Sequence, residues 1–153
     1  MSPSWLQRRR KRHLVWVSGL VPGLLWTGAA LADPCKAIPD RGKAPAYLSP
    51  GSTFSGPVVY VGDGDSLCVA VGQGPENWVE VRLQDFYAPE LREPGGEAAK
   101  RALERVANGK RATCRASHQS WDRVVARCEI GGRSVGDLMR AQGVAEGGNS
   151  ARR

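Results

Sequence analysis

The sequence predicts an α+β fold that is mainly β: a five-stranded, OB-like β-barrel with two or so helices. Short runs of β-branched and aromatic residues alternate with turn clusters rich in glycine and proline, the pattern of successive short strands. A helical stripe separates the third run from the fourth, and a shorter helix follows the fifth. Five strands with a helix between the third and the fourth are typical of a small OB-type barrel.

The first three strands are predicted at residues 58–61, 67–71 and 78–83. The third strand alternates strictly between an apolar and a polar face. The two faces consist of Val79, Val81 and Leu83 on one side, and of Trp78, Glu80 and Arg82 on the other. This alternation directs Arg82 away from the apolar core.

The second half of the barrel begins with a helix predicted at residues 97–106, which Gly109 would end. Its apolar stripe recurs at helical spacing and consists of Ala98, Ala99, Ala102, Leu103 and Val106. Strands at 110–116 and 123–130 follow, joined by a polar loop at 117–122. A short helix, which begins at Val135 and closes at Gly143, completes the predicted fold.

The chain divides into a signal peptide (1–32), an irregular N-terminal arm (33–57), the barrel domain (58–146) and a disordered tail (147–153). The first segment has a basic run, a short apolar stretch and an Ala-Leu-Ala end, the layout of a secretory signal peptide. A membrane anchor is the alternative, but glycine, serine and proline interrupt the apolar stretch, which falls short of the roughly 20 residues that span a bilayer. We therefore expect cleavage after Ala32, a periplasmic or secreted protein, and no stable membrane anchor afterwards.

Net charge by itself gives little support for binding to nucleic acid. The formal charge of the chain is +7, but residues 1–32 hold five of the basic residues and no acidic one. Without that segment the charge is +2. A role in binding acidic polymers must therefore rest on where particular arginines lie.

Four cysteines follow the predicted signal peptide, and they include no Cys-x-x-Cys pair, which argues against a zinc site. An even number of cysteines in an exported protein favours disulfides. Cys114 and Cys128 lie about equally far from the centre of the connection between the fourth and fifth strands, so we expect them to face each other and to form a disulfide. Buried free thiols are the alternative. By elimination, Cys35 would pair with Cys68 and tie the arm to the second strand.

Three polar motifs occur in order along the predicted barrel. They are Gly-Asp-Gly-Asp-Ser at 62–66, Arg-Leu-Gln-Asp-Phe-Tyr-Ala-Pro-Glu at 82–90 and Trp-Asp-Arg at 121–123. Taken singly each is weak, because an Asp-Gly-Asp turn, a strand arginine and a loop glutamate are common without any function. Together, from about residue 58 to 145, they resemble the staphylococcal-nuclease (thermonuclease-like) family, whose motifs are Asp-Gly-Asp-Thr, Arg-Leu-x-x-(Val/Ile)-Asp-(Thr/Ala)-Pro-Glu and Tyr-Gly-Arg.

The resemblance implies roles for individual residues. Arg82 and Arg123 would hold the scissile phosphate, and Glu90 would activate a water molecule. Asp65 and the carbonyl of Ala88 would bind calcium. These residue types suit those roles, because guanidinium groups offer paired donors to phosphate, a carboxylate can take a proton from water, and calcium requires several oxygen ligands.

Two departures from the family pattern concern Tyr87 and Trp121. Tyr87 stands where the family has an aspartate, and a neutral phenol is a poor calcium ligand. Asp63 and Asp85 could restore part of that charge. Trp121 keeps an aromatic ring two residues before Arg123 and could contribute to substrate binding by stacking on a base.

The sequence therefore predicts a periplasmic or secreted phosphodiesterase, a calcium-dependent nuclease that hydrolyses DNA or RNA with a weakened calcium site. The alternative is a non-catalytic nucleic-acid- or phosphate-binding module of the same fold, which the carboxylate lost at Tyr87 favours. We expect the protein to be a monomer.

Overall fold

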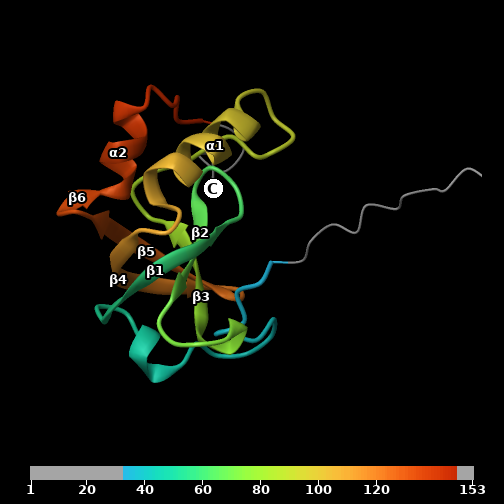
Figure 1. Ribbon diagram of the computed structural model, residues 1–153. Helices are drawn as coiled ribbons and strands as arrows, with labels where there is room; N and C mark the ends of the chain where they lie inside the picture. Colours follow the sequence, from blue (N-terminus) through green and yellow to red (C-terminus); the bar gives the residue numbers. More distant parts are fainter. Residues whose placement is uncertain (1–32, 148–153) are drawn as a thin grey trace, which may run out of the picture. The chain divides into compact units, whose positions relative to one another are not determined.

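The structure is a computed structural model that describes residues 33–147 (Figure 1). The predicted signal peptide (1–32) and all but the first residue of the predicted tail lie outside the described residues. Among residues 33–147, no helix has the length and apolar character needed to cross a membrane.

Within this part of the chain, six strands and two α-helices follow one another. The strands are β1 (Thr53–Val61), β2 (Ser66–Ala70), β3 (Trp78–Leu83), β4 (Arg111–Ser120), β5 (Arg123–Ile130) and β6 (Arg133–Ser134). The α-helices are α1 (Gly96–Ala107) and α2 (Val135–Ala141), and the short 3-10 turns are η1 (Ala46–Leu48) and η2 (Pro75–Asn77). β3 and β5 have the predicted bounds, whereas β4 continues through most of the predicted loop at 117–122 and leaves a turn of two residues.

The strands close into a barrel through one parallel pairing. β1 pairs with β2 and β4, β2 with β3, and β4 with β5, all of them antiparallel. β3 then pairs with β5 in parallel, with Val81 opposite Val124. This closure confirms the predicted five-stranded, OB-like fold, and β6 adds a short edge strand beside β5.

β1 begins five residues before its predicted start at Val58, so the irregular arm covers 33–52 rather than 33–57. Its first half pairs with β4 and its second half with β2. Gly56 and Pro57, which favoured a loop, lie where the strand changes partner. A Cβ atom at Gly56 would lie 1.8 Å from the carbonyl oxygen of Ala70, so this close approach requires glycine.

α1 packs four members of its predicted stripe against the barrel: Ala99, Ala102, Leu103 and Val106 are buried. The fifth, Ala98, is exposed, so the prediction was wrong at that position. Ala98 lies five residues before Leu103, which places it roughly 140° around the helix axis at about 100° per residue. It therefore falls outside the face that contacts the core.

Both predicted disulfides are present in the described residues. Cys114 and Cys128 are direct cross-strand partners in β4 and β5, with Cα atoms 4.0 Å apart. Cys35 bonds to Cys68 and fixes the arm to β2, while the backbone N–H of Ala37 donates to the carbonyl oxygen of Trp78 at 3.1 Å. The beginning of the arm therefore lies against the outer side of β2 and β3.

Candidate functional site

The Asp-Gly-Asp motif forms a tight turn between β1 and β2, packed under the segment that follows β3. A Cβ atom at Gly64 would lie 2.4 Å from the Cβ of Ala88 and 2.5 Å from that of Ala99, so glycine permits this packing. Asp65 is only 2% exposed, and its Oδ2 accepts a hydrogen bond from the backbone N–H of Ala88 at 2.8 Å. The first and second motifs are thus joined through one carboxylate.

Arg82 reaches the same carboxylate from β3. It lies opposite Ser66 in the β2–β3 register, and its Nη2 is 2.8 Å from Oδ2 of Asp65. Burial and the neighbouring charge of Asp63 raise the pKa of Asp65 to about 7, against the opposing effects of the Ala88 hydrogen bond and the Arg82 charge. The ion pair is therefore complete only above neutral pH.

Asp63 is held differently within the same turn. Its Oδ1 accepts hydrogen bonds from the backbone N–H of Asp65 at 3.0 Å and from the hydroxyl of Ser66 at 2.5 Å. Burial raises the pKa of Asp63, but these hydrogen bonds and the charge of Arg82 outweigh that effect and leave the pKa below its usual value. Asp63 is the ionised member of the aspartate pair at neutral pH.

Arg123 lies on the same outer face of the barrel as Arg82. β3 and β5 run parallel with Arg82 opposite Val125, so Arg123 lies two residues back along the neighbouring strand. Val81 and Val124 alternate with the two arginines and are buried, which places both arginines on the outer face of their strands, although the Arg82 side chain is only 13% exposed because it turns onto Asp65. Two of the predicted phosphate-binding residues are thus brought to one face.

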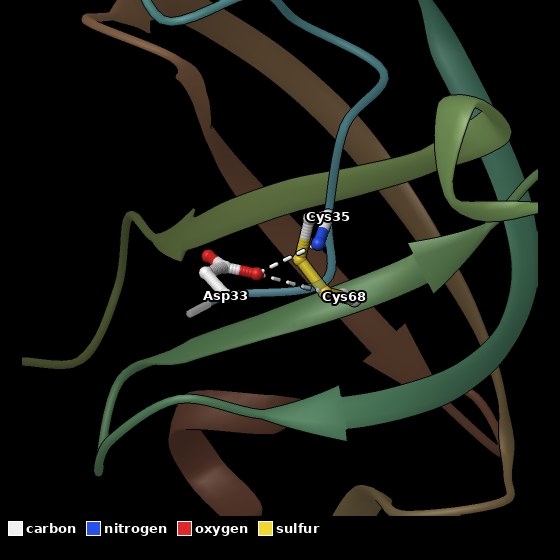
Figure 2. Close-up of side chains that lie close together, drawn as sticks. All are labelled: Asp33, Cys35 and Cys68. Carbon is white, nitrogen blue, oxygen red and sulfur yellow. Dashed lines mark hydrogen bonds between the residues drawn. A yellow bond between two sulfur atoms is a disulfide. The ribbon is translucent and has the colours of Figure 1, made fainter. Parts of the chain in front are cut away.

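A carboxyl cluster that the sequence did not predict lies beside Arg123. Glu80 is opposite Cys68 in the β2–β3 register, and the Cys35–Cys68 disulfide brings Asp33 to the same place (Figure 2). Oδ1 of Asp33 accepts a hydrogen bond from the N–H of Cys35 at 2.8 Å. The same oxygen lies 3.5 Å from the Cys68 sulfur, which is a contact and not a hydrogen bond because a disulfide sulfur carries no proton. The arm thereby adds an acidic group to this face.

Glu80 is the most perturbed member of this cluster. Burial raises its pKa to about 8, together with the nearby charges of Asp33 and Asp122 and a hydrogen bond to Asp33, while the charge of Arg123 acts in the opposite direction. Glu80 is therefore largely protonated at neutral pH and leaves Arg123 with little competition from that carboxyl group.

The loop after β3 carries Tyr87 and Glu90, and both are exposed. The carboxylate of Glu93 accepts a hydrogen bond from the backbone N–H of Glu90 at 3.0 Å, and the N–H of Glu93 donates to the carbonyl oxygen of Glu90 at 2.8 Å. These bonds fix the backbone at the predicted general base. Its side chain is accessible to solvent, as activation of water requires.

The structure places Asp85 against α2 and β5. Its Oδ2 accepts a hydrogen bond from Ser134 at 2.6 Å and lies 3.5 Å from Nη1 of Arg127, and its backbone carbonyl accepts one from Arg140 at 2.5 Å. Oδ1 is buried with no hydrogen-bond partner among residues 33–147. Asp85 is thus engaged with the start of α2.

These contacts make the carboxylates a poor fit to calcium as they are arranged. Calcium takes six to eight oxygen ligands, but Oδ2 of Asp65 is engaged by two donors and Oδ1 of Asp63 by two others. Among the described residues, the one cluster of three with metal-binding atoms is Asp33, Cys35 and Cys68, whose sulfurs are joined in a disulfide and are not thiolate ligands. Calcium at this site stays a prediction.

Trp121 occupies the turn between β4 and β5, beside Arg123. It is 83% exposed and has a φ of 60°, a left-handed conformation that is uncommon outside glycine. The side chain of Gln119 supports this turn by donating hydrogen bonds to the carbonyl oxygens of Trp121 at 2.6 Å and Gly42 at 2.8 Å. The arm therefore helps to present an aromatic ring at the edge of the arginine-bearing face.

Strand alternation places Glu80 on the same face as Arg82. It does not indicate that Glu80 has an acidic neighbour, because Asp33 is 47 residues away in the sequence. The predicted Cys35–Cys68 pairing was the signal that could have joined them. Comparison with protein-family models and with curated proteins found no match.

Proposed function

We propose that this protein binds a phosphodiester of DNA or RNA between Arg82 and Arg123 and hydrolyses it, with Glu90 as the general base. The observation that carries the proposal is that the two arginines project from neighbouring, paired strands onto one outer face. Guanidinium groups meet phosphate oxygens with two parallel donors each, and two of them can stabilise the extra negative charge of a pentacoordinate phosphate.

The remaining residues supply the parts of a hydrolytic reaction. The exposed carboxylate of Glu90 would take a proton from a water molecule as the water oxygen attacks phosphorus and the bond to the leaving oxygen breaks, and the leaving oxygen would take up a proton from solvent. Trp121 would stack on a neighbouring base and position the nucleic acid. Export, which the two disulfides are compatible with, would place this activity in the periplasm or outside the cell.

The decisive experiment compares cleavage of a labelled single-stranded DNA and RNA by the wild type and by Glu90→Gln, with and without calcium. We expect the variant to lose about 10²–10⁴-fold in cleavage rate, the usual contribution of a general base. Glu76→Gln is the matched control, because Glu76 is an exposed glutamate in η2. Equal rates for the wild type and Glu90→Gln would reject the assignment of the base.

A second candidate function is binding without hydrolysis. It is favoured by the 2.8 Å ion pair between Arg82 and Asp65, which engages one phosphate-binding group, and by the phenol at Tyr87. Under this alternative the wild type binds oligonucleotides, the Arg123→Gln variant binds them more weakly, and no cleavage occurs with any divalent cation. Cleavage that depends on Glu90 would exclude it.

A further inference from the structure

A second pair of arginines, Arg115 and Arg127, lies on the outer face of the barrel, further along β5 than Arg123. Arg115 of β4 is directly opposite Arg127 of β5, one position beyond the Cys114–Cys128 pair. The disulfide is buried and both arginines are exposed, so they project from the opposite side of the strands. Like charges directly opposite each other destabilise a sheet, and within residues 33–147 only Arg127 of the two has an acidic partner, the carboxylate of Asp85.

An open groove of about 360 Å³ lies at the two arginines. Its polar side chains are Gln84, Arg115, Ser117 and Arg127, and no carboxylate lines it. The β4–β5 register shifts between Ala116 and His118, so Ser117 is the extra residue of a β-bulge. A bulge changes the direction in which nearby side chains project. Each of the four polar side chains offers N–H or O–H donors, which suits an anionic ligand.

The charges in the groove are poorly neutralised. Arg127 makes a loose ion pair with Asp85, at 3.5 Å, and is 53% exposed. The side chain of Arg115 makes no ion pair or hydrogen bond within residues 33–147. Two guanidinium groups in register, with the single carboxylate of Asp85 near one of them, form a local positive site although the chain after residue 32 carries a net charge of only +2.

The groove and the site of the proposed function share one strand. Arg123 and Arg127 lie four residues apart on β5 and on the same face, about 13 Å at roughly 3.3 Å per residue. This separation corresponds to roughly four nucleotides at a stacked rise of 3.4 Å each. His118 and Val125, which are cross-strand partners between the two sites, are exposed or partly exposed along this path.

We propose that the groove at Arg115 and Arg127 is a second phosphate-binding subsite, and that the ligand is single-stranded nucleic acid of at least about four nucleotides, lying along the outer face of β5. This inference rests on the proposed function of Arg82 and Arg123. With two subsites this far apart, the expected substrate is a polymer rather than a mononucleotide or a dinucleotide.

The test measures fluorescence anisotropy of labelled oligothymidylates of two, four, eight and twelve nucleotides, as a function of salt, with their integrity checked on gels. The proteins are the wild type, Arg115→Gln, Arg115→Gln/Arg127→Gln and the control Arg101→Gln, which removes an exposed arginine from α1. We expect the wild type to bind the 8-mer on the order of tenfold more tightly than the 2-mer. The double variant should lose that advantage, and its salt slope should fall by about 1.4, since each contact with a single strand contributes about 0.7.

The double variant removes the Arg127–Asp85 ion pair and could impair folding for that reason. The single variant Arg115→Gln keeps this ion pair, so it still tests the groove. Arg115→Gln relieves repulsion, so its Tm should equal or exceed that of the wild type while its salt slope falls by about 0.7. An unchanged 8-mer affinity and slope in both variants would reject the groove but leave the proposed function standing. Equal competition by polyglutamate would reject nucleic acid as its ligand. Absence of binding at every length would reject the inference and the proposed function together.

Discussion

The outer face of the barrel carries two pairs of arginines that differ in how closely carboxyl groups surround them. Around Arg82 and Arg123, carboxyl groups are close: Asp65 makes an ion pair with the first, and Glu80 lies beside the second. At the groove, Arg115 has no acidic partner among residues 33–147. We infer that pH controls the first pair, because protonation of its carboxyl groups frees the arginines, whereas ionic strength controls the second.

The largest expected effect concerns the loss of one arginine from each pair. Arg82→Ala leaves Asp65 buried without its cation and should lower the free energy of unfolding by about 2 kcal/mol. The loss should grow between pH 6 and 8.5, as Asp65 gives up its proton through a pKa of about 7. Arg115→Ala should change the free energy of unfolding by less than about 0.5 kcal/mol. Denaturant unfolding at both pH values checks this, and equal losses in the two variants would contradict the comparison.

The next effect concerns Glu80, whose pKa is raised to about 8. A carboxyl group with a raised folded-state pKa stabilises the fold fully below its unfolded pKa, and this stability is lost as pH rises through the folded value. The free energy of unfolding should therefore fall between pH 4 and pH 8.5, by on the order of 1–2 kcal/mol after allowance for solvent screening at this half-buried site.

Glu80→Gln should remove the part of that pH dependence that Glu80 causes, since the amide does not ionise, and leave the part due to Asp65, whose pKa is also raised. The control is Glu76→Gln, which removes the same charge from an exposed turn and should leave the wild-type profile in place. If Glu80→Gln follows the wild-type profile, Glu80 is not the group that titrates, and the pH control assigned to the first pair is wrong.

The smallest effect concerns an added carboxylate next to the first pair. Tyr87→Asp returns an anionic oxygen to the loop that follows β3 and should tighten calcium binding, on the order of tenfold, measured by calorimetry. Tyr87→Phe is the control, because it removes the hydroxyl without adding charge. An unchanged calcium affinity would mean that the oxygens of Asp63 and Asp65 stay engaged by their present donors.

The sequence predicted most of the barrel because local alternation and the apolar stripe determine which faces are buried. It failed where a neighbour across the sheet decides the outcome: Gly56 and Pro57 indicate a loop, yet pairing with β4 makes them part of β1. β4 likewise continues through Ser120 although its last residues are polar, because β5 pairs with them. β6 has two residues and is too short to produce a pattern.

The candidate site was predictable to a similar degree. Outward projection of Arg82 follows from alternation alone, but its ion pair with Asp65 depends on the β2–β3 register and on burial of the turn. The pairing of Arg115 with Arg127 could have been predicted, because it follows from the register that places Cys114 opposite Cys128. The engagement of Asp85 with α2 could not, since nothing local in the sequence links these segments.

The parallel pairing of β3 with β5 has a consequence for how the protein folds. Every other pairing in the barrel is antiparallel, and the hairpins β1–β2, β2–β3 and β4–β5 join strands that are neighbours in the chain. The β1–β4 and β3–β5 pairings join strands that lie far apart in the chain, so a long loop must close before either pairing can form. We therefore expect the hairpins to form early and closure of the barrel to be a late step in folding. Because Arg82 and Arg123 come from these two strands, the face that bears both arginines would then be among the last parts of the molecule to assemble.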